Sequence, residues 1–121
     1  MTEQQIIETL AMKVMGWKKA LAMDGVTPYW DTGDFCGGKW IEPVGHRDKD
    51  NIDVWNPLQN IADAWQVVGK LKEHSFTLEN RFFYDVWYAT FEETSAYGPI
   101  YRGKGSTAQE AICNAALKAV A

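Results

Sequence analysis

A glycine-rich segment, residues 98–107 (GPIYRGKGST), carries groups that could bind a phosphate. Gly98, Gly103 and Lys104 match the phosphate-binding loop of nucleoside triphosphatases, but Gly105 stands where that loop needs the Ser or Thr that holds magnesium. The segment therefore does not favour such an enzyme. It still predicts a glycine turn leading into a helix, where exposed N–H groups and the helix dipole favour an anion. The candidate phosphate ligands are Arg102, Gly103, Lys104, Gly105, Ser106 and Thr107, and the alternative is an ordinary strand-to-helix connection.

The run RFFYDVWYATF, residues 81–91, is aromatic or apolar at most positions. Side chains alternate between the two faces of a strand, so we expect Phe82 and Trp87 on opposite faces. Purine bases stack on such rings, and a neighbouring arginine strengthens the contact. The candidate ligand-binding residues here are Arg81, Phe82 and Trp87, with Arg102 nearby. The alternative is a strand covered on both faces, whose rings fill a core.

Groups for catalysis or metal binding are sparse. His46 and His74 are the two histidines, and neither has the neighbouring ligands of a zinc site. The acidic stretch at 48–52 begins like a calcium loop but lacks its turn glycine and closing glutamate. Cys36 and Cys113 have no catalytic neighbourhood, so we expect two reduced structural thiols. We therefore predict a protein that is not an enzyme and holds no metal or cofactor.

Length and composition narrow the class of protein. The 121 residues correspond to a single domain, 1–121. A net charge of −4 argues against the basic field of a nucleic-acid binder. With no apolar stretch of about 20 residues and no signal sequence, we expect a cytoplasmic protein without a membrane partner. Aromatic residues make up 13% of the chain, which predicts that some line a ligand pocket or the interface of a homo-oligomer built on a dimer.

Turn residues and apolar spacing predict an α+β fold with a mainly antiparallel sheet. Thr2 and Gln5 have the spacing of a capping box, and Asn56 is a candidate cap for the second helix. The predicted helices run from Thr2 to Gly16, from Asn56 to His74 and from Thr107 onward. The predicted strands are residues 29–30, 39–41, 75–78, 81–91 and 99–102, with turns at 79–80 and 93–98. The resulting order is helix, two strands, helix, three strands, helix.

Three runs resemble a known family: residues 12–17 (MKVMGW), 60–68 (NIADAWQVV) and 111–117 (AICNAAL). In this order they are similar to the phage ABA-sandwich domain family, small phage and prophage proteins with an α/β sandwich. The resemblance covers most of the chain and is weak between residues 20 and 56. It adds Trp17 and Asn114 to the candidate ligand-binding residues. Many relatives have arginine at the position of Asn114, and this departure weakens any charge-based role there.

The chain is also similar to the Thoeris anti-defence sponges of phages. That resemblance implies a protein that captures a cyclic ADP-ribose isomer made by bacterial TIR-domain enzymes, without hydrolysing it. The aromatic excess, the anion-friendly turn and the lack of catalytic groups agree with this interpretation. One alternative is a phage inhibitor that docks on a host protein. Another is a nucleotide hydrolase, against which the absence of a paired acid and base argues.

Overall fold

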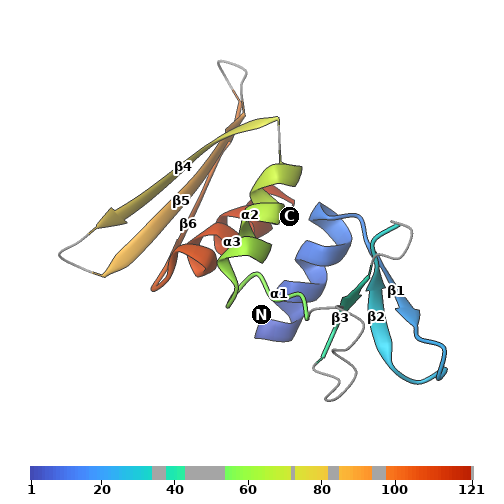
Figure 1. Ribbon diagram of the computed structural model, residues 1–121. Coiled ribbons are helices and arrows are strands. Elements are labelled where there is room, and N and C mark those ends of the chain that lie inside the picture. The colour runs from blue at the N-terminus through green and yellow to red at the C-terminus, as the bar shows by residue number, and fades with distance from the viewer. Residues whose placement is uncertain (34–37, 43–53, 72, 82–84, 94–97, 121) are drawn as a thin grey trace.

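The computed structural model describes residues 1–33, 38–42, 54–71, 73–81, 85–93 and 98–120 (Figure 1). Its first element, α1 (Glu3–Thr9), starts with the predicted capping box: the Thr2 hydroxyl accepts from the Gln5 N–H, and the Gln5 side chain accepts from the Thr2 N–H. The helix continues as a π-helical stretch, η1 (Leu10–Val14). Gly16 follows with φ +74°, a conformation that favours glycine and ends the helix where the sequence predicts.

The first sheet contains one strand more than the sequence predicts. Strands β2 (Pro28–Asp31) and β3 (Lys39–Trp40) form the expected antiparallel pair. A further strand, β1 (Lys18–Leu21), pairs antiparallel with β2. The Lys19 ammonium reaches back to the Glu8 carboxylate on α1, 2.6 Å away, and lies 5.8 Å from the centre of the Trp30 ring. These contacts depend on residues distant in sequence, so local patterns did not indicate the strand.

Helix α2 (Ile61–Lys70) begins and ends inside its predicted range. Its cap is Asn60, whose side-chain oxygen accepts from the N–H groups of Ala62 and Asp63. Asn56 instead holds a preceding turn, since its side chain accepts from the Leu58 N–H and its own N–H donates to the Asp63 carboxylate. The predicted boundaries at 56 and 74 are therefore wrong.

The second sheet is the predicted three-stranded antiparallel meander, with different boundaries. It consists of β4 (His74–Arg81), β5 (Val86–Glu93) and β6 (Ile100–Gly105), in that spatial order. The predicted turn at 79–80 is wrong, because β4 pairs with β5 as far as Arg81. Asp85, with φ +48°, precedes β5, so residues 81–91 are not one strand. The predicted end of the last strand at 102 is also wrong, because β6 continues to Gly105.

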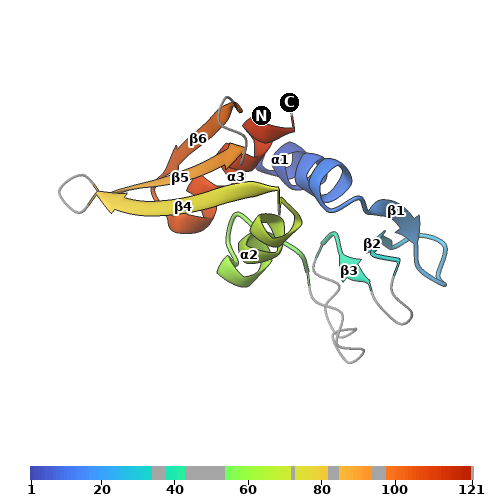
Figure 2. The same ribbon diagram turned by 90° about the horizontal axis from the view of Figure 1, so that it is seen from above.

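The last helix, α3 (Ala108–Ala119), is capped by Thr107 as predicted and packs on β5 and β6. Figures 1 and 2 show α2 beside α3 on this inner face of the second sheet, with α1 and the first sheet beyond them. This arrangement confirms the predicted α+β sandwich. The alternative interpretation of residues 81–91, a strand covered on both faces, does not hold within the single chain, because the open face of the sheet carries exposed charged side chains such as Glu79 and Lys104.

Most of the aromatic residues that the structure describes belong to the core or pack against it. The indole rings of four tryptophans are buried: Trp17, Trp30, Trp40 and Trp55. Trp17 and Trp55 meet edge to face, 4.9 Å apart. On the inner face of the second sheet, the fully buried Phe91 packs against Phe76 at 5.1 Å. Large rings thus fill the space between the layers, where they bury much apolar area per residue.

Candidate functional site

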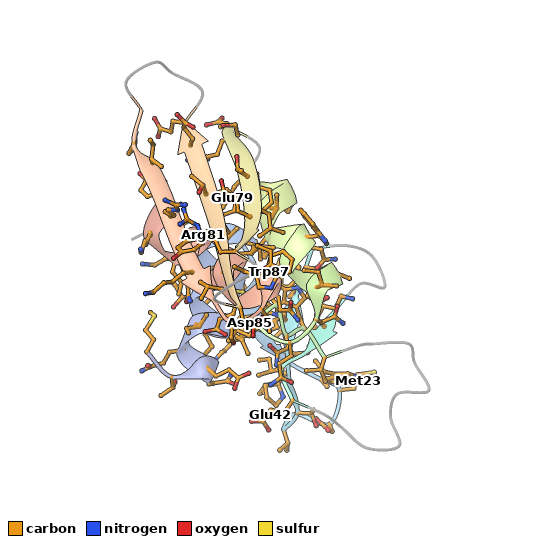
Figure 3. The ribbon with its side chains drawn as sticks, turned by 90° about the vertical axis from the view of Figure 1, so that its left-hand side faces the viewer. Met23, Glu42, Glu79, Arg81, Asp85 and Trp87 are labelled. Carbon is orange, nitrogen blue, oxygen red and sulfur yellow. The ribbon has the colours of Figure 1, made fainter. Side chains whose placement is uncertain are left out.

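The open face of the second sheet brings several predicted site residues together around Tyr88. Figure 3 labels two residues of this face, Glu79 and Arg81. In the register of the strands, Glu79 and Lys104 lie directly opposite Tyr88 on either side. Arg81 and Arg102 lie at the two diagonal positions, within reach of long side chains. Their guanidinium carbons are 5.2 Å and 4.6 Å from the centre of the Tyr88 ring. We call these five residues the cationic face: Glu79, Arg81, Tyr88, Arg102 and Lys104.

The cationic face has an excess of positive charge in a chain that is acidic as a whole. Glu79 is its one carboxylate, and the nearest approach of its Oε2 to Nη2 of Arg102 is 3.8 Å. Both side chains are about half exposed (52% and 49%), so water screens this pair and it contributes little to stability. Three cations against one carboxylate leave a local field that attracts an anion.

The ring and the guanidinium groups provide two kinds of binding surface. A cation over a tyrosine face is attracted by the ring quadrupole, which holds the guanidinium groups of Arg81 and Arg102 in place. A guanidinium group can bind a phosphate through two parallel N–H donors, which a lysine cannot do. Planar guanidinium and tyrosine groups also offer stacking surfaces for a nucleobase. The arrangement therefore suits a ligand that combines phosphate with a base.

The predicted glycine turn is the end of strand β6, and helix α3 packs directly against it. A Cβ on Gly103 would lie 2.2 Å from the backbone nitrogen of Ala115, and a Cβ on Gly105 would lie 2.7 Å from the Glu110 Cβ. The missing side chains of both glycines thus allow α3 to approach β6. The prediction that they form an exposed turn is wrong, because both belong to β6.

Ser106 and Thr107 lie at the start of α3, where an acidic side chain is already present. The Thr107 hydroxyl accepts from the Glu110 N–H, and the Ser106 hydroxyl donates to the Glu110 carboxylate at 2.9 Å. The carboxylate therefore sits where the helix dipole favours negative charge. A phosphate at this end of α3 would meet that negative charge.

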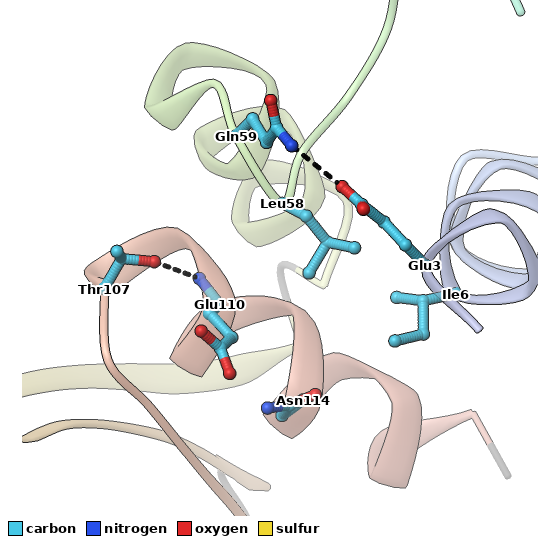
Figure 4. A pocket seen from close by; sticks show the side chains of 7 residues that line it. All are labelled: Glu3, Ile6, Leu58, Gln59, Thr107, Glu110 and Asn114. Carbon is cyan, nitrogen blue, oxygen red and sulfur yellow. Dashed lines mark hydrogen bonds between the residues drawn. The ribbon is translucent and has the colours of Figure 1, made fainter. Parts of the chain in front are cut away.

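A pocket of about 360 Å³ opens beside this helix start, between α1, α3 and the turn before α2 (Figure 4). Its walls are Glu3, Ile6, Leu58, Gln59, Thr107, Glu110 and Asn114. Gln59 donates to the Glu3 carboxylate, and Asn114 donates to the backbone carbonyl of Lys104. With two carboxylates in its walls and no cationic side chain, the pocket is a poor place for a diphosphate.

The remaining predicted site residues do not join the cationic face. Trp17 is part of the core, and Trp87 lies half-buried on the inner face of the sheet, packed against that core. Phe82 lies outside the described residues. Tyr88 was missed as a site residue because its neighbours across the sheet depend on a turn that the sequence did not locate.

The described residues contain no group of three or more His, Cys, Asp or Glu side chains that could hold a metal ion. Cys113 is buried in α3, and burial raises the pKa of its thiol to about 12, with a smaller contribution from the Glu110 charge. A thiol with this pKa stays protonated at neutral pH and is a poor nucleophile. This agrees with a structural role for Cys113.

A comparison with protein-family models identifies the family. The model of the phage ABA sandwich domain matches residues 8–117, which is nearly the whole chain. The chain belongs to this family. The resemblance seen in the three sequence runs is thereby confirmed, and phage ABA sandwich membership indicates a phage accessory protein. Searches of the curated proteins and of the solved structures found no match.

Two family runs have clear structural roles in this phage ABA sandwich protein. Ala111 and Ala115 lie in the AICNAAL run and form the surface of α3 that meets the two glycines of β6. Gly16 and Trp17 end the first helix and start the packing against Trp55. In the part of the chain that is described, no helix is long and apolar enough to span a membrane.

Proposed function

We propose that this phage ABA sandwich protein binds and sequesters a cyclic ADP-ribose-type nucleotide made by TIR-domain immune enzymes, and that the cationic face is its binding site. The observation that carries the proposal is the placement of Tyr88 between Arg81 and Arg102, with Lys104 opposite. Such a ligand has two phosphates and an adenine, and the cationic face offers cations and stacking surfaces side by side.

Sequestration without catalysis is the second part of the proposal. Of the five residues of the cationic face, only Glu79 could act as a general base, and it faces a cationic partner, Arg102. General acid–base hydrolysis uses an acid and a base placed on either side of the bond that breaks, and the cationic face has only this one carboxylate. We therefore expect the bound nucleotide to be released unchanged.

The test is an incubation of the protein with two linkage isomers of cyclic ADP-ribose, followed by ultrafiltration, heat denaturation and chromatography of the released nucleotide. Depletion of an isomer from the filtrate, with intact release after denaturation, is the expected result. An altered product would indicate an enzyme, and no depletion would contradict nucleotide binding.

A matched pair of variants locates the site. Arg102→Ala removes a cation from the cationic face, and Lys70→Ala removes one from the exposed end of α2. Both change the net charge equally. Loss of depletion in Arg102→Ala alone supports the cationic face, whereas equal behaviour of the two variants would place the ligand elsewhere.

A second candidate function, docking on a host protein, is favoured by the β1–β2 hairpin. Its tip exposes Leu21, Met23 and Val26, which are apolar. The turn at the tip is closed by hydrogen bonds, because the Asp24 carboxylate accepts from the N–H groups of Val26 and Thr27. An exposed apolar tip is typical of a protein-binding element. If no isomer is depleted while the protein remains folded, this candidate takes precedence.

A further inference from the structure

The two edges of the second sheet differ in how their outward hydrogen-bonding groups are satisfied. On the β6 edge, the Arg102 carbonyl accepts from the Lys118 ammonium at 2.5 Å, and the Lys104 carbonyl accepts from the Asn114 amide at 2.8 Å. Both donors come from α3. Side chains of the packed helix therefore cap this edge, which keeps another strand from adding to it.

No side chain among the described residues caps the β4 edge in this way. The backbone N–H and C=O groups of Arg102 and Lys104 face away from β5. Because this direction alternates along antiparallel strands, the backbone groups of Phe76, Leu78 and Asn80 also face away from β5, on the β4 edge. His74 follows the same alternation, and its N–H is used by the Leu71 carbonyl. Among the described residues, none bonds to the outward N–H and C=O groups of the other three.

Two features that often protect an edge strand, a β-bulge and a proline, are also missing from β4. The strand pairs residue for residue with β5 from His74 to Arg81, so it contains no bulge, and its sequence HSFTLENR contains no proline. Apolar surface lies next to it on α2. Trp65 is 47% exposed and its ring is 5.7 Å from that of Phe76, and Ile61 is 41% exposed.

We propose that β4 pairs with β4 of a second copy of this chain, antiparallel about a two-fold axis, to form one continuous six-stranded sheet. One register pairs all the outward N–H and C=O groups of Phe76, Leu78 and Asn80. It places Leu78 opposite the partner's Leu78 and Phe76 opposite the partner's Asn80. On the open face it places Thr77 opposite the partner's Glu79 and Ser75 opposite the partner's Arg81. No charged side chain then directly opposes one of the same sign.

The pattern of one free and one capped edge explains why the occupant is a second copy and why growth stops at two. A two-fold pairing uses the same surface on both subunits, so it closes on itself. The outer edges of the dimer would be the β6 edges, which Asn114 and Lys118 cap. The two α2 helices would flank the axis and cover exposed surface of Trp65. This inference does not depend on the nucleotide.

Proline at position 80 tests the inference with little effect on the single chain. The Asn80 N–H points outward, so Asn80→Pro removes an edge donor and leaves the β4–β5 ladder bonds in place. Light scattering should give twice the 13.7 kDa chain mass for the natural protein at 100 μM. We expect Asn80→Pro to weaken the dimer at least tenfold and Asn80→Ala to leave it unchanged. A natural protein of single-chain mass, or a folded Asn80→Pro variant that dimerises equally tightly, would overturn the proposal.

Cross-linking keeps the proposal testable if the proline variant does not fold. Thr77 and the partner's Glu79 would form a non-hydrogen-bonded pair, in which Cα atoms are about 4.5 Å apart and a disulfide fits. In a Cys36→Ser background, Thr77→Cys with Glu79→Cys should give a cross-linked dimer on mild oxidation. Ser75→Cys with Glu79→Cys, which the register places diagonally at about 7–8 Å, too far for an unstrained disulfide, should give at least tenfold less. Equal cross-linking of the two pairs would refute the register and the edge pairing.

Discussion

Gly103 of β6 lies directly beneath Ala115 of α3, so close that a Cβ on the glycine would be 2.2 Å from the alanine backbone nitrogen. Backbone atoms of a packed helix cannot move aside as a flexible side chain can. The close approach of α3 to the second sheet therefore depends on glycine at this position, and small residues on the helix complete the contact.

We expect Gly103→Ala to destabilise the protein by at least about 3 kcal/mol, the upper end of the usual cost of overpacking, because α3 must shift as a unit. Urea unfolding followed by circular dichroism measures the change. A loss below about 1 kcal/mol would contradict this packing.

Gly69→Ala is the matched control for that substitution. Gly69 lies inside α2, and a Cβ added there would have no other atom within 4 Å, so alanine adds helix propensity without a clash. We expect a gain in the free energy of unfolding of roughly 0.5–1 kcal/mol. A lower free energy of unfolding in Gly69→Ala would show that alanine in place of glycine destabilises this protein for a reason other than a steric clash.

Local signals in the sequence were sufficient for some elements and misleading for others. The capping box of Thr2 and Gln5 acts within four residues, so the first helix starts where predicted. Asn56 and Asn60 are both suitable helix caps, four residues apart. Asn60 caps α2 because the Asn56 N–H is hydrogen-bonded to the Asp63 carboxylate and Asn56 lies in the preceding turn. Strand β1 was missed because its stabilising contacts, such as that from Lys19 to Glu8, join different elements.

The candidate site was only partly predictable for the same reason. Arg81 and Arg102 were identified from residue type, but their contact with Tyr88 depends on strand register. That register depends on β5 beginning after Asp85, with φ +48°, and the aromatic run concealed this start. The glycines near the end of β6 suggested an anion site, although their role is to admit α3.

The Tyr88 ring is expected to matter for nucleotide binding more than its hydroxyl. Tyr88→Ala removes the surface that orients both guanidinium groups and should lower affinity for a cyclic ADP-ribose isomer by about one to two decades, the cost of about 1–3 kcal/mol for a lost stacking contact. Tyr88→Phe keeps the ring and should bind within about threefold of the natural protein. Isothermal titration calorimetry measures both, and equal losses would mean that the hydroxyl is the binding group.

Arg102 and Lys104 are expected to differ in how they act on the ligand. Arg102 is oriented by Tyr88 and can bind a phosphate through two donors, so Arg102→Ala should raise the dissociation rate strongly. Lys104 is an exposed point charge, and Lys104→Ala should mainly lower the association rate and its dependence on salt. Stopped-flow binding at low and moderate salt separates the two effects. Equal, small effects would show that the phosphates are bound elsewhere.

The buried thiol of Cys113 is expected to make stability depend on pH in the alkaline range. Its pKa is raised from 9.0 to about 12 in the folded protein, so above pH 9 the unfolded chain loses this proton first and stability falls until about pH 12. Within this window the natural protein should lose up to about 1.4 kcal/mol per pH unit more than Cys113→Ala. Urea unfolding of both proteins between pH 8 and 10.5 measures the difference. Parallel curves would show that the thiol is not protected from ionisation.

The caps on the β6 edge are expected to limit assembly as well as to hold α3. If β4 edges pair in the dimer, the double variant Asn114→Ala with Lys118→Ala frees the outward carbonyls of Lys104 and Arg102 at both ends of the six-stranded sheet. Free edges at both ends allow further strands to add, so light scattering should detect species heavier than the dimer that increase with concentration. Adding Asn80→Pro to the double variant should remove most of this growth, because it blocks the β4 junction on which each longer assembly depends. A folded double variant that stays at the mass of the dimer would show that these two side chains only fasten the helix to the strand.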